Sequence, residues 1–250
     1  MRPYEDKFLI QMINKYNKLL NEEECGLHRI VKTKEEKLSG YLYKEEKHLD
    51  LEIPKLFHGD NLVMELTPKE IQGYFEFIKN AEGKVGIVGL GLGYLVQELA
   101  KKKEVTEIVV YEISSEVIEI YKKNFKNKRK VKILQQDAFK AEKQKFDFFF
   151  VDIYNEQLTE KCAEDYKIFT KIHEIEEYSF WGMEHFLLSC SYEEIIWVFI
   201  PELWMDMTKD LSRVLSESGN LQSYKPLEPQ LVSNVLARFK EILNEGEEEY

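Results

Sequence analysis

The chain of 250 residues can form one large domain, or a domain with a small appendage. Its net charge of −11 opposes a general nucleic-acid surface, which needs a basic face. The basic stretch 122–132 is interpreted as a solvated helix end. Three scattered cysteines form no metal-binding motif, and no segment is apolar and long enough to span a bilayer, so we expect a cytoplasmic protein without a metal site.

The first third of the chain predicts a helix followed by a small β unit. Apolar residues from Tyr4 to Leu20 fall on one face of a helix. Three short, roughly alternating segments then predict antiparallel strands, at Leu27–Lys32, Lys37–Lys44 and His48–Ile53. We therefore expect a first unit of residues 1–64, formed by a helix and a β appendage.

A helix start is predicted next, at Thr67-Pro68-Lys69-Glu70. Thr67 has the residue type of a cap, Pro68 suits the first helical position, and Glu70 has the spacing of a capping box. The predicted helix continues to about Asn80. Gln72, Tyr74 and Phe75 on this helix could cover the cofactor pocket, with core packing favoured for the two aromatic residues.

A glycine-rich turn, Gly89-Leu90-Gly91-Leu92-Gly93, lies between an apolar strand and a helix. The strand is predicted at Val85–Val88, and a second strand at Ile108–Tyr111 ends in Glu112. Glycine permits a positive φ and lets a ligand approach the backbone closely. A carboxylate at the end of the second strand can accept hydrogen bonds from both hydroxyls of a ribose. This combination predicts a nucleoside site at the edge of a parallel sheet.

Two further strands are also followed by acids. Val131–Leu134 precedes Asp137 and Ala138, and Phe146–Val151 precedes Asp152. The strands are nearly continuous in apolar residues, as expected for parallel strands that are covered on both faces. Open α/β sheets bind ligands at the carboxyl ends of their strands. We therefore expect these acids beside the same ligand.

The glycine spacing distinguishes between nucleosides. A dinucleotide fingerprint requires a small residue where this chain has Tyr94, because the helix must pack closely above a pyrophosphate. The pattern G-x-G-x-G suits a ligand without a pyrophosphate. Each acid also has a plain structural interpretation: Glu112 as a solvated strand end, Asp137 as a turn residue and Asp152 as a helix cap.

In these motifs the chain resembles the class I S-adenosylmethionine-dependent methyltransferases. It is most similar to spermidine-synthase-like proteins, through Gly-Leu-Gly-Leu-Gly-Tyr, Val-Tyr-Glu-Ile-Ser-Ser-Glu-Val-Ile and Asp-Phe-Phe-Phe-Val-Asp. The resemblance implies a Rossmann-like, mostly parallel sheet with helices on both faces. It also implies S-adenosylmethionine as cofactor, and these cofactor residues: Gly89, Gly91, Gly93, Tyr94, Glu112, Ile113, Asp137 and Ala138. Asp152 and Tyr154 are the expected catalytic residues.

The chain departs from these families at several positions. Many methyltransferases have an acid where this chain has Ile87, and aminopropyltransferases have Asp where it has Leu92. The second carboxylate of the aminopropyltransferase Asp-x-x-Asp is replaced by Asn155, an amide that cannot act as a base. The acceptor, and the way the amino-acid end of the cofactor is held, are not predicted.

The last part of the chain predicts helices. A fifth strand is expected between residues 178 and 190, and amphipathic segments follow at 195–215, with a break near Pro201, and at 228–243. No antiparallel hairpin of the kind that completes a seven-stranded methyltransferase sheet is evident. We therefore expect a cofactor domain at 65–192 and a helical extension at 193–250.

The functional prediction is a transferase that methylates a small molecule. The alternatives are an aminopropyltransferase similar to spermidine synthase, and a non-catalytic nucleoside-binding protein. A nicotinamide oxidoreductase is disfavoured by Tyr94. We expect no membrane or nucleic-acid partner, and a homo-oligomer is possible.

Overall fold

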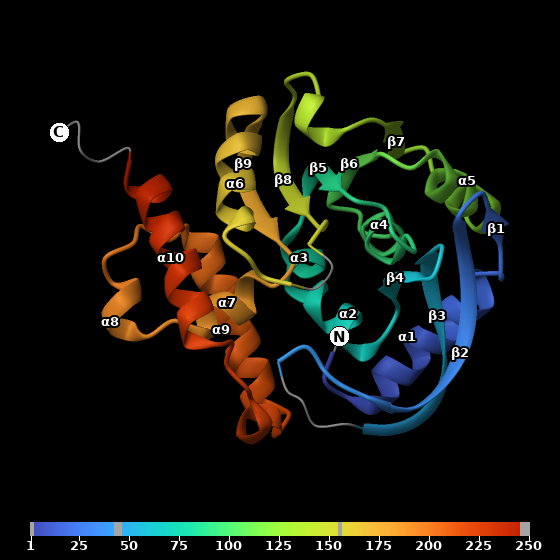
Figure 1. Cartoon of the computed structure of the whole chain (residues 1–250), viewed down its shortest axis with the longest axis horizontal. Helices are drawn as coiled ribbons and strands as arrows, with labels where there is room; N and C mark the ends of the chain where they lie inside the picture. Colours follow the sequence, from blue (N-terminus) through green and yellow to red (C-terminus); the bar gives the residue numbers. More distant parts are fainter. Residues whose placement is uncertain (1–2, 43–46, 155–156, 246–250) are drawn as a thin grey trace.

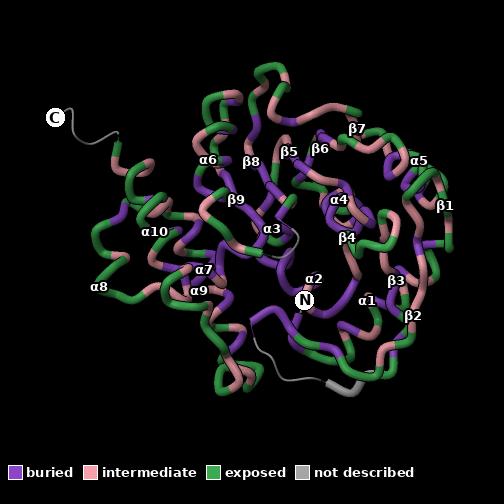
Figure 2. The backbone as a smooth tube through the Cα atoms, in the orientation of Figure 1, coloured by how far each residue is buried: buried purple, intermediate pink, exposed green. Residues whose placement is uncertain are grey.

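The computed structural model describes residues 3–42, 47–154 and 157–245. An antiparallel sheet near the N-terminus lies beside a parallel sheet, and a helical group follows at the C-terminal end (Figure 1). Figure 2 shows that buried residues concentrate in the central strands and in the helices that precede them. None of the described helices has the length and apolar character needed to cross a membrane.

The N-terminal unit contains the predicted helix and a four-stranded antiparallel sheet in the order β1-β2-β3-β4. Its elements are α1 (Asp6–Leu19), β1 (Glu24–Cys25), β2 (His28–Leu38), β3 (Lys47–His58) and β4 (Asn61–Glu65). The prediction of three short strands was wrong. Because β2 continues through the charged stretch 32–37 and pairs with β3 from His28–His58 to Leu38–Lys47, the two form one long ribbon. Residues 43 and 44 of the predicted middle strand lie outside the described residues.

The parallel sheet has five strands in the order β7-β6-β5-β8-β9, and every neighbouring pair is parallel. Its strands are β5 (Gly83–Val88), β6 (Val105–Glu112), β7 (Val131–Gln135), β8 (Lys145–Val151) and β9 (Glu174–Phe180). The first four confirm the predicted strands. The fifth strand begins earlier than expected and overlaps the predicted range 178–190 only up to Phe180, because most of the remainder of that range forms a helix, Met183–Ser189. The chain moves outward from β5 in one direction and then returns to its other side at β8. Such a reversal opens a crevice at the carboxyl ends of the strands.

Helices cover both faces of this sheet. They are α2 (Pro68–Gly73), α3 (Phe75–Asn80), α4 (Tyr94–Leu99), α5 (Ser115–Asn124), the 3-10 turn η1 (Ala138–Lys140) and α6 (Lys161–Ile172). Successive phenylalanines of β8 face opposite sides, as strand geometry requires. Phe150 packs on Phe77 of α3, with ring centroids 4.4 Å apart, and Phe149 packs on Phe169 of α6 at 5.4 Å. The predicted Rossmann-like architecture is confirmed.

The described residues after Phe180 add no strand to the parallel sheet. They form α7 (Met183–Ser189), α8 (Tyr192–Ile195), α9 (Glu202–Glu217), η2 (Asn220–Ser223) and α10 (Pro229–Asn244). Pro201 precedes α9 and accounts for the predicted break. Aromatic rings join this group to the sheet, since Phe180 stacks on Phe239 of α10 with centroids 5.7 Å apart and meets Trp204 of α9 at 5.6 Å.

Candidate functional site

The glycine turn follows β5 directly, at the crevice of the parallel sheet. Gly89, Gly91 and Gly93 have φ of 99°, 50° and 76°, values that glycine adopts without strain. A Cβ on Gly89 would lie 2.5 Å from the carbonyl oxygen of Asp152, and one on Gly91 would collide with the sulfur of Met64. A Cβ on Gly93 would instead meet the ring of Tyr121 on α5. The first two glycines therefore form the floor of the crevice, whereas Gly93 permits close packing between α4 and α5.

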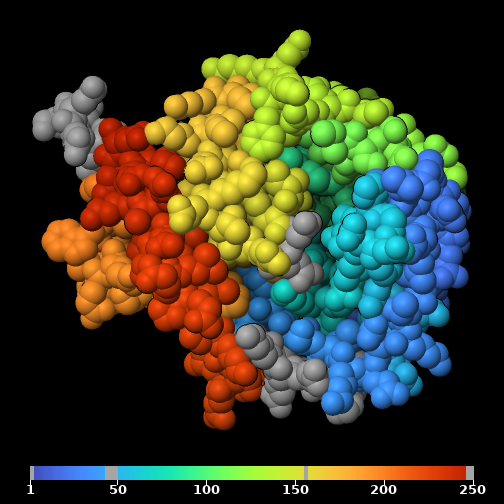
Figure 3. All heavy atoms as spheres, in the orientation of Figure 1, coloured from blue at the N-terminus to red at the C-terminus, as the bar shows by residue number. Residues whose placement is uncertain are grey.

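Two cavities meet over this turn, and both are lined by Gly89, Glu112 and Ile153. The first, of about 220 Å³, lies between the turn and α2 and is also lined by Val63, Met64, Glu70, Tyr74, Leu90, Gly91 and Asp152. The second, of about 200 Å³, lies towards β7 and is also lined by Val88, Tyr111, Ile113, Gln136, Asp137, Ala138 and Phe139. Together they reach the size of a small-molecule site. In Figure 3 the surface is hollowed between the yellow segment after β8 and the cyan β3–β4 hairpin.

Glu112 is held in a fixed orientation at the junction of the two cavities. Its Oε2 accepts a hydrogen bond from the main-chain N–H of Leu90 at 3.0 Å, and its Oε1 accepts one from the N–H of Ser114 at 2.8 Å. Each carboxylate oxygen retains a second lone pair, so both can accept a further hydrogen bond. Glu112 is therefore placed to bind two neighbouring hydroxyls.

Glu112→Ala is expected to weaken nucleoside binding by about 1.5–3 kcal/mol, the range for hydrogen bonds to a charged group. This corresponds to roughly a ten- to over a hundredfold higher Kd, measured by calorimetry with S-adenosylhomocysteine. Glu107→Ala is the matched control, because Glu107 lies at the other end of β6 and pairs with Lys132 at 2.8 Å. Unchanged affinity in Glu112→Ala would assign Glu112 only to the structure of the turn.

The second cavity combines an exposed apolar wall with a small polar edge. Ile113 is 72% exposed although it is large and apolar, and it lies at the cavity mouth. Asp137 caps η1 by accepting from the N–H of Phe139 at 3.1 Å, and it pairs with Lys140 at 3.2 Å. Ala138 is buried beside it. Asp137 therefore has the turn role that its sequence predicts, and it also lines the second cavity.

The first cavity is strongly acidic. Among the residues that the structure describes, Glu70, Glu112 and Asp152 line it, and no Lys, Arg or His does. The hydroxyl of Tyr74 donates to Oδ2 of Asp152. Burial and the neighbouring Asp152 and Glu70 carboxyls raise the pKa of Tyr74 well above its usual value. Tyr74 therefore remains protonated and acts as a fixed donor to Asp152.

Two members of this cluster were not predicted as site residues. Thr67 precedes α2 but its side chain makes no cap hydrogen bond, so the predicted capping box does not form. Glu70 is instead 3% exposed and lines the cavity. Tyr74 lies at the break between α2 and α3, where one continuous helix was predicted. Gly73, directly before Tyr74, is the sequence signal for this break, but nothing in the sequence shows that Glu70 or Tyr74 reaches the cavity.

Three predicted residues line neither cavity: Gly93, which packs against α5, and the two tyrosines Tyr94 and Tyr154. Tyr94 is buried between the rings of Tyr16, at 5.0 Å, and Tyr74, at 5.9 Å. Tyr154 is buried against Phe180, with ring centroids 6.4 Å apart. Because β8 ends at Val151, the strand alternation that would place Tyr154 on the same side as Asp152 does not continue. Asn155 lies outside the described residues.

The fold is that of a Rossmann-like α/β domain with a crevice over a glycine turn. Residues 74–172 match the family model of the methyltransferase small domain, which is less than half of the chain. The predicted resemblance to class I S-adenosylmethionine-dependent methyltransferases is thereby confirmed over this segment. No curated protein matches the chain.

Solved structures similar to the chain include a spermidine synthase and two methyltransferases. Spermidine synthase from Thermotoga maritima is 16% identical, with 80% of this chain and 62% of that chain covered and a TM-score of 0.41. The SAH-bound methyltransferase of Podospora anserina is 16% identical, with 60% of this chain and 67% of that chain covered and a TM-score of 0.37. An S-adenosylmethionine-dependent methyltransferase from Clostridium acetobutylicum is 14% identical, with 44% of this chain and 48% of that chain covered and a TM-score of 0.35. The chain thus spans less than two thirds of the length of the spermidine synthase.

Proposed function

We propose that the two joined cavities bind S-adenosylmethionine and that the protein transfers its methyl group to a small acceptor. The observation that carries this proposal is Glu112, whose carboxylate is fixed by the main chain of the glycine turn at the junction of the cavities. Its oxygens would accept from the two ribose hydroxyls. The match of residues 74–172 to a methyltransferase domain supports the same assignment.

The remaining groups of the nucleoside have complementary partners in this arrangement. Ile113, Asp137 and Ala138 would hold the adenine in the second cavity, with Gly89 and Gly91 beside the sulfur-bearing chain. Glu70 would bind the ammonium group of the cofactor. In the families that the chain resembles, an acid at the position of Ile87 or of Leu92 would do this instead. Both Ile87 and Leu92 are buried here.

Asp152 would serve the acceptor in the transfer step. An acceptor lone pair attacks the methyl carbon as the bond from carbon to the sulfonium breaks, leaving the thioether S-adenosylhomocysteine. Asp152 takes the proton that the acceptor loses, while Tyr74 donates to Oδ2 and fixes the carboxylate. Alignment of acceptor, carbon and sulfur supplies much of the remaining acceleration.

Aminopropyl transfer is the second candidate, and the charge of the first cavity favours it. Three carboxyl groups and no lining cation suit a ligand that carries ammonium and sulfonium groups without a carboxylate. Decarboxylated S-adenosylmethionine has these groups. Aminopropyltransferases have a second aspartate where this chain has Asn155. Glu70, which lines the same cavity as Asp152, would supply a second acid instead.

Calorimetric titration with the two nucleosides tests the proposal. For methyl transfer we expect S-adenosylmethionine to bind at least as tightly as its decarboxylated form. Glu70→Gln should raise both Kd values roughly ten- to a hundredfold, because each nucleoside has the ammonium group. The exposed Glu193→Gln on α8 is the control. A decarboxylated form that binds more than about tenfold tighter would replace methyl by aminopropyl transfer, and failure of both to bind would contradict the proposal.

A further inference from the structure

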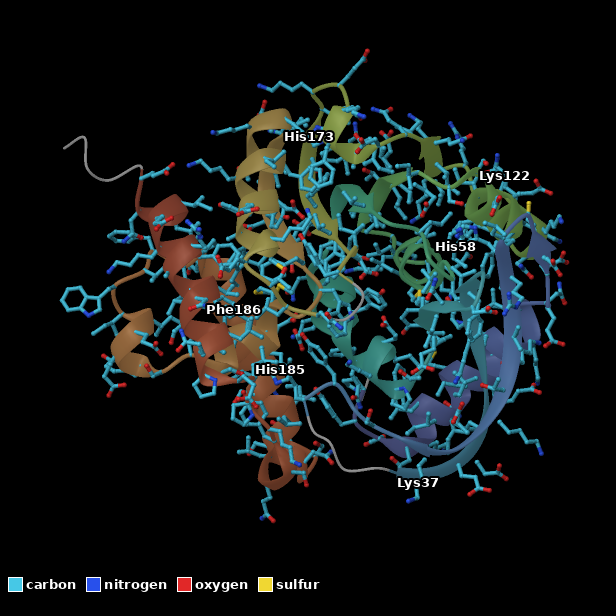
Figure 4. All side chains as sticks on the ribbon, in the orientation of Figure 1. Lys37, His58, Lys122, His173, His185 and Phe186 are labelled. Carbon is cyan, nitrogen blue, oxygen red and sulfur yellow. The ribbon has the colours of Figure 1, made fainter. Side chains whose placement is uncertain are left out.

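A separate cavity lies on the outer side of α5, where the chain enters β7. It has a volume of about 320 Å³ and is lined by Tyr121, Lys122, Phe125, Asn127, Lys128, Val131 and Ile133. Figure 4 shows Lys122 beside α5 at the outer edge of the molecule. The second nucleoside cavity lies towards the other end of β7, where Gln136 and Asp137 follow the strand. Ile133 and Gln136, which line the two places, are three residues apart, roughly 10 Å along an extended chain.

The lining is basic in an acidic protein. Lys122 and Lys128 bring two ammonium groups and Asn127 an amide, and the described part of the chain places no carboxyl group in the lining, although the chain has a net charge of −11. Within the residues that the structure describes, neither lysine side chain forms an ion pair or a hydrogen bond. Neighbouring cations differ, since Lys123 pairs with Glu119 at 3.4 Å and Lys132 with Glu107 at 2.8 Å.

The surroundings of Lys128 add to this excess of positive charge. Burial lowers the pKa of Lys128, and the like charges of Lys130 and Lys15 lower it further, against the attraction of Glu98. Glu98 is already shared, because its Oε1 accepts from Lys15 at 3.0 Å and from Lys101. A bound anion would stabilise the charged form of Lys128.

We propose that this cavity binds a small organic phosphate at a second site that is independent of the nucleoside site. The ammonium groups of Lys122 and Lys128 and the amide of Asn127 would donate to the phosphate oxygens, whose charge of nearly −2 at pH 7 matches two lysines. Phe125, Val131 and Ile133 would contact an apolar or aromatic body. A concave site with an apolar wall favours a small ligand over a nucleic-acid backbone, which needs an extended basic face.

Calorimetry with phenyl phosphate tests this site. We expect submillimolar binding to the intact chain, and Kd at least tenfold higher in Lys122→Glu and in Lys128→Gln. Lys122 is exposed, so its substitution should leave folding intact. Lys240→Glu on α10 makes the same charge change at an exposed lysine outside the cavity, and its Kd should stay within twofold.

Several results would overturn the proposal. These are the absence of binding at 10 mM phenyl phosphate, an equal loss in Lys240→Glu, and displacement of phenyl phosphate by saturating S-adenosylhomocysteine. A 20-nucleotide RNA that binds more than tenfold tighter than phenyl phosphate, and loses affinity in the same two variants, would assign the surface to nucleic acid instead. Retained phenyl phosphate binding alongside no nucleoside binding would support this site while contradicting the proposed function.

Discussion

Asp152→Asn is expected to lower turnover about 10²–10⁴-fold, the usual contribution of a general base. The amide keeps the size of the side chain and can still accept from Tyr74, so the first cavity should keep its shape. Nucleoside affinity should stay within a few-fold, because Asp152 is assigned to the acceptor. Release of S-adenosylhomocysteine with a panel of small nucleophiles measures the effect.

Two comparisons make the Asp152 result specific. Asp206→Asn changes an exposed aspartate on α9 and should remain fully active. Tyr74→Phe removes the donor to Asp152 and should change the pH profile of turnover without abolishing nucleoside binding. An Asp152→Asn protein as active as the original, or one that unfolds while the Asp206 variant does not, would rule out the catalytic role.

Glu184→Gln is expected to remove a large pH dependence of stability. Glu184 is buried on α7, where Tyr41 donates to its Oε2 at 3.2 Å. Burial raises the pKa of Glu184 from 4.5 to about 8, with a further contribution from Glu76. The folded protein therefore keeps this carboxyl protonated up to about pH 8, whereas the unfolded chain loses the proton above about 4.5. Folded stability from this group is present below pH 4.5 and decreases as pH rises towards 8.

The glutamine variant carries no proton to lose. Since one pKa unit corresponds to about 1.4 kcal/mol, its free energy of unfolding relative to the original should increase by about 3 kcal/mol between pH 5 and 8. Urea denaturation at both pH values measures this difference. Glu193→Gln, at an exposed position of α8, should show almost none. Parallel pH curves for the original chain and Glu184→Gln would mean that Glu184 is ionised in the folded protein.

The sheet was predictable because its signal is local. The strands β5, β6 and β8 contain apolar runs that are followed by a glycine or an acid, and parallel pairing brings those ends to one edge. Glu112 and Asp152 therefore line the crevice that their positions predict. The long β2–β3 ribbon was missed because charged residues alternate along an exposed strand as they do in a turn.

The acceptor side was less predictable because it depends on how separate elements pack. Glu70 has the spacing of a helix cap, and only the approach of α2 to the glycine turn places it in the cavity. Tyr74 reaches Asp152 from a helix break that directly follows Gly73, and a single glycine in a helical pattern does not show where the next side chain will point. Tyr154 was expected as a catalytic residue because it follows Asp152 closely in the sequence, but β8 ends at Val151 and Tyr154 is buried against Phe180.

Titration with S-adenosylhomocysteine, with NAD as the comparison, tests the central claim most directly. The thioether nucleoside fills the proposed site without turnover, so calorimetry measures binding alone. We expect micromolar affinity for S-adenosylhomocysteine and no heat with NAD, because Tyr94 stands where a dinucleotide fold needs a small residue. Binding of NAD together with no binding of S-adenosylhomocysteine would contradict the assignment.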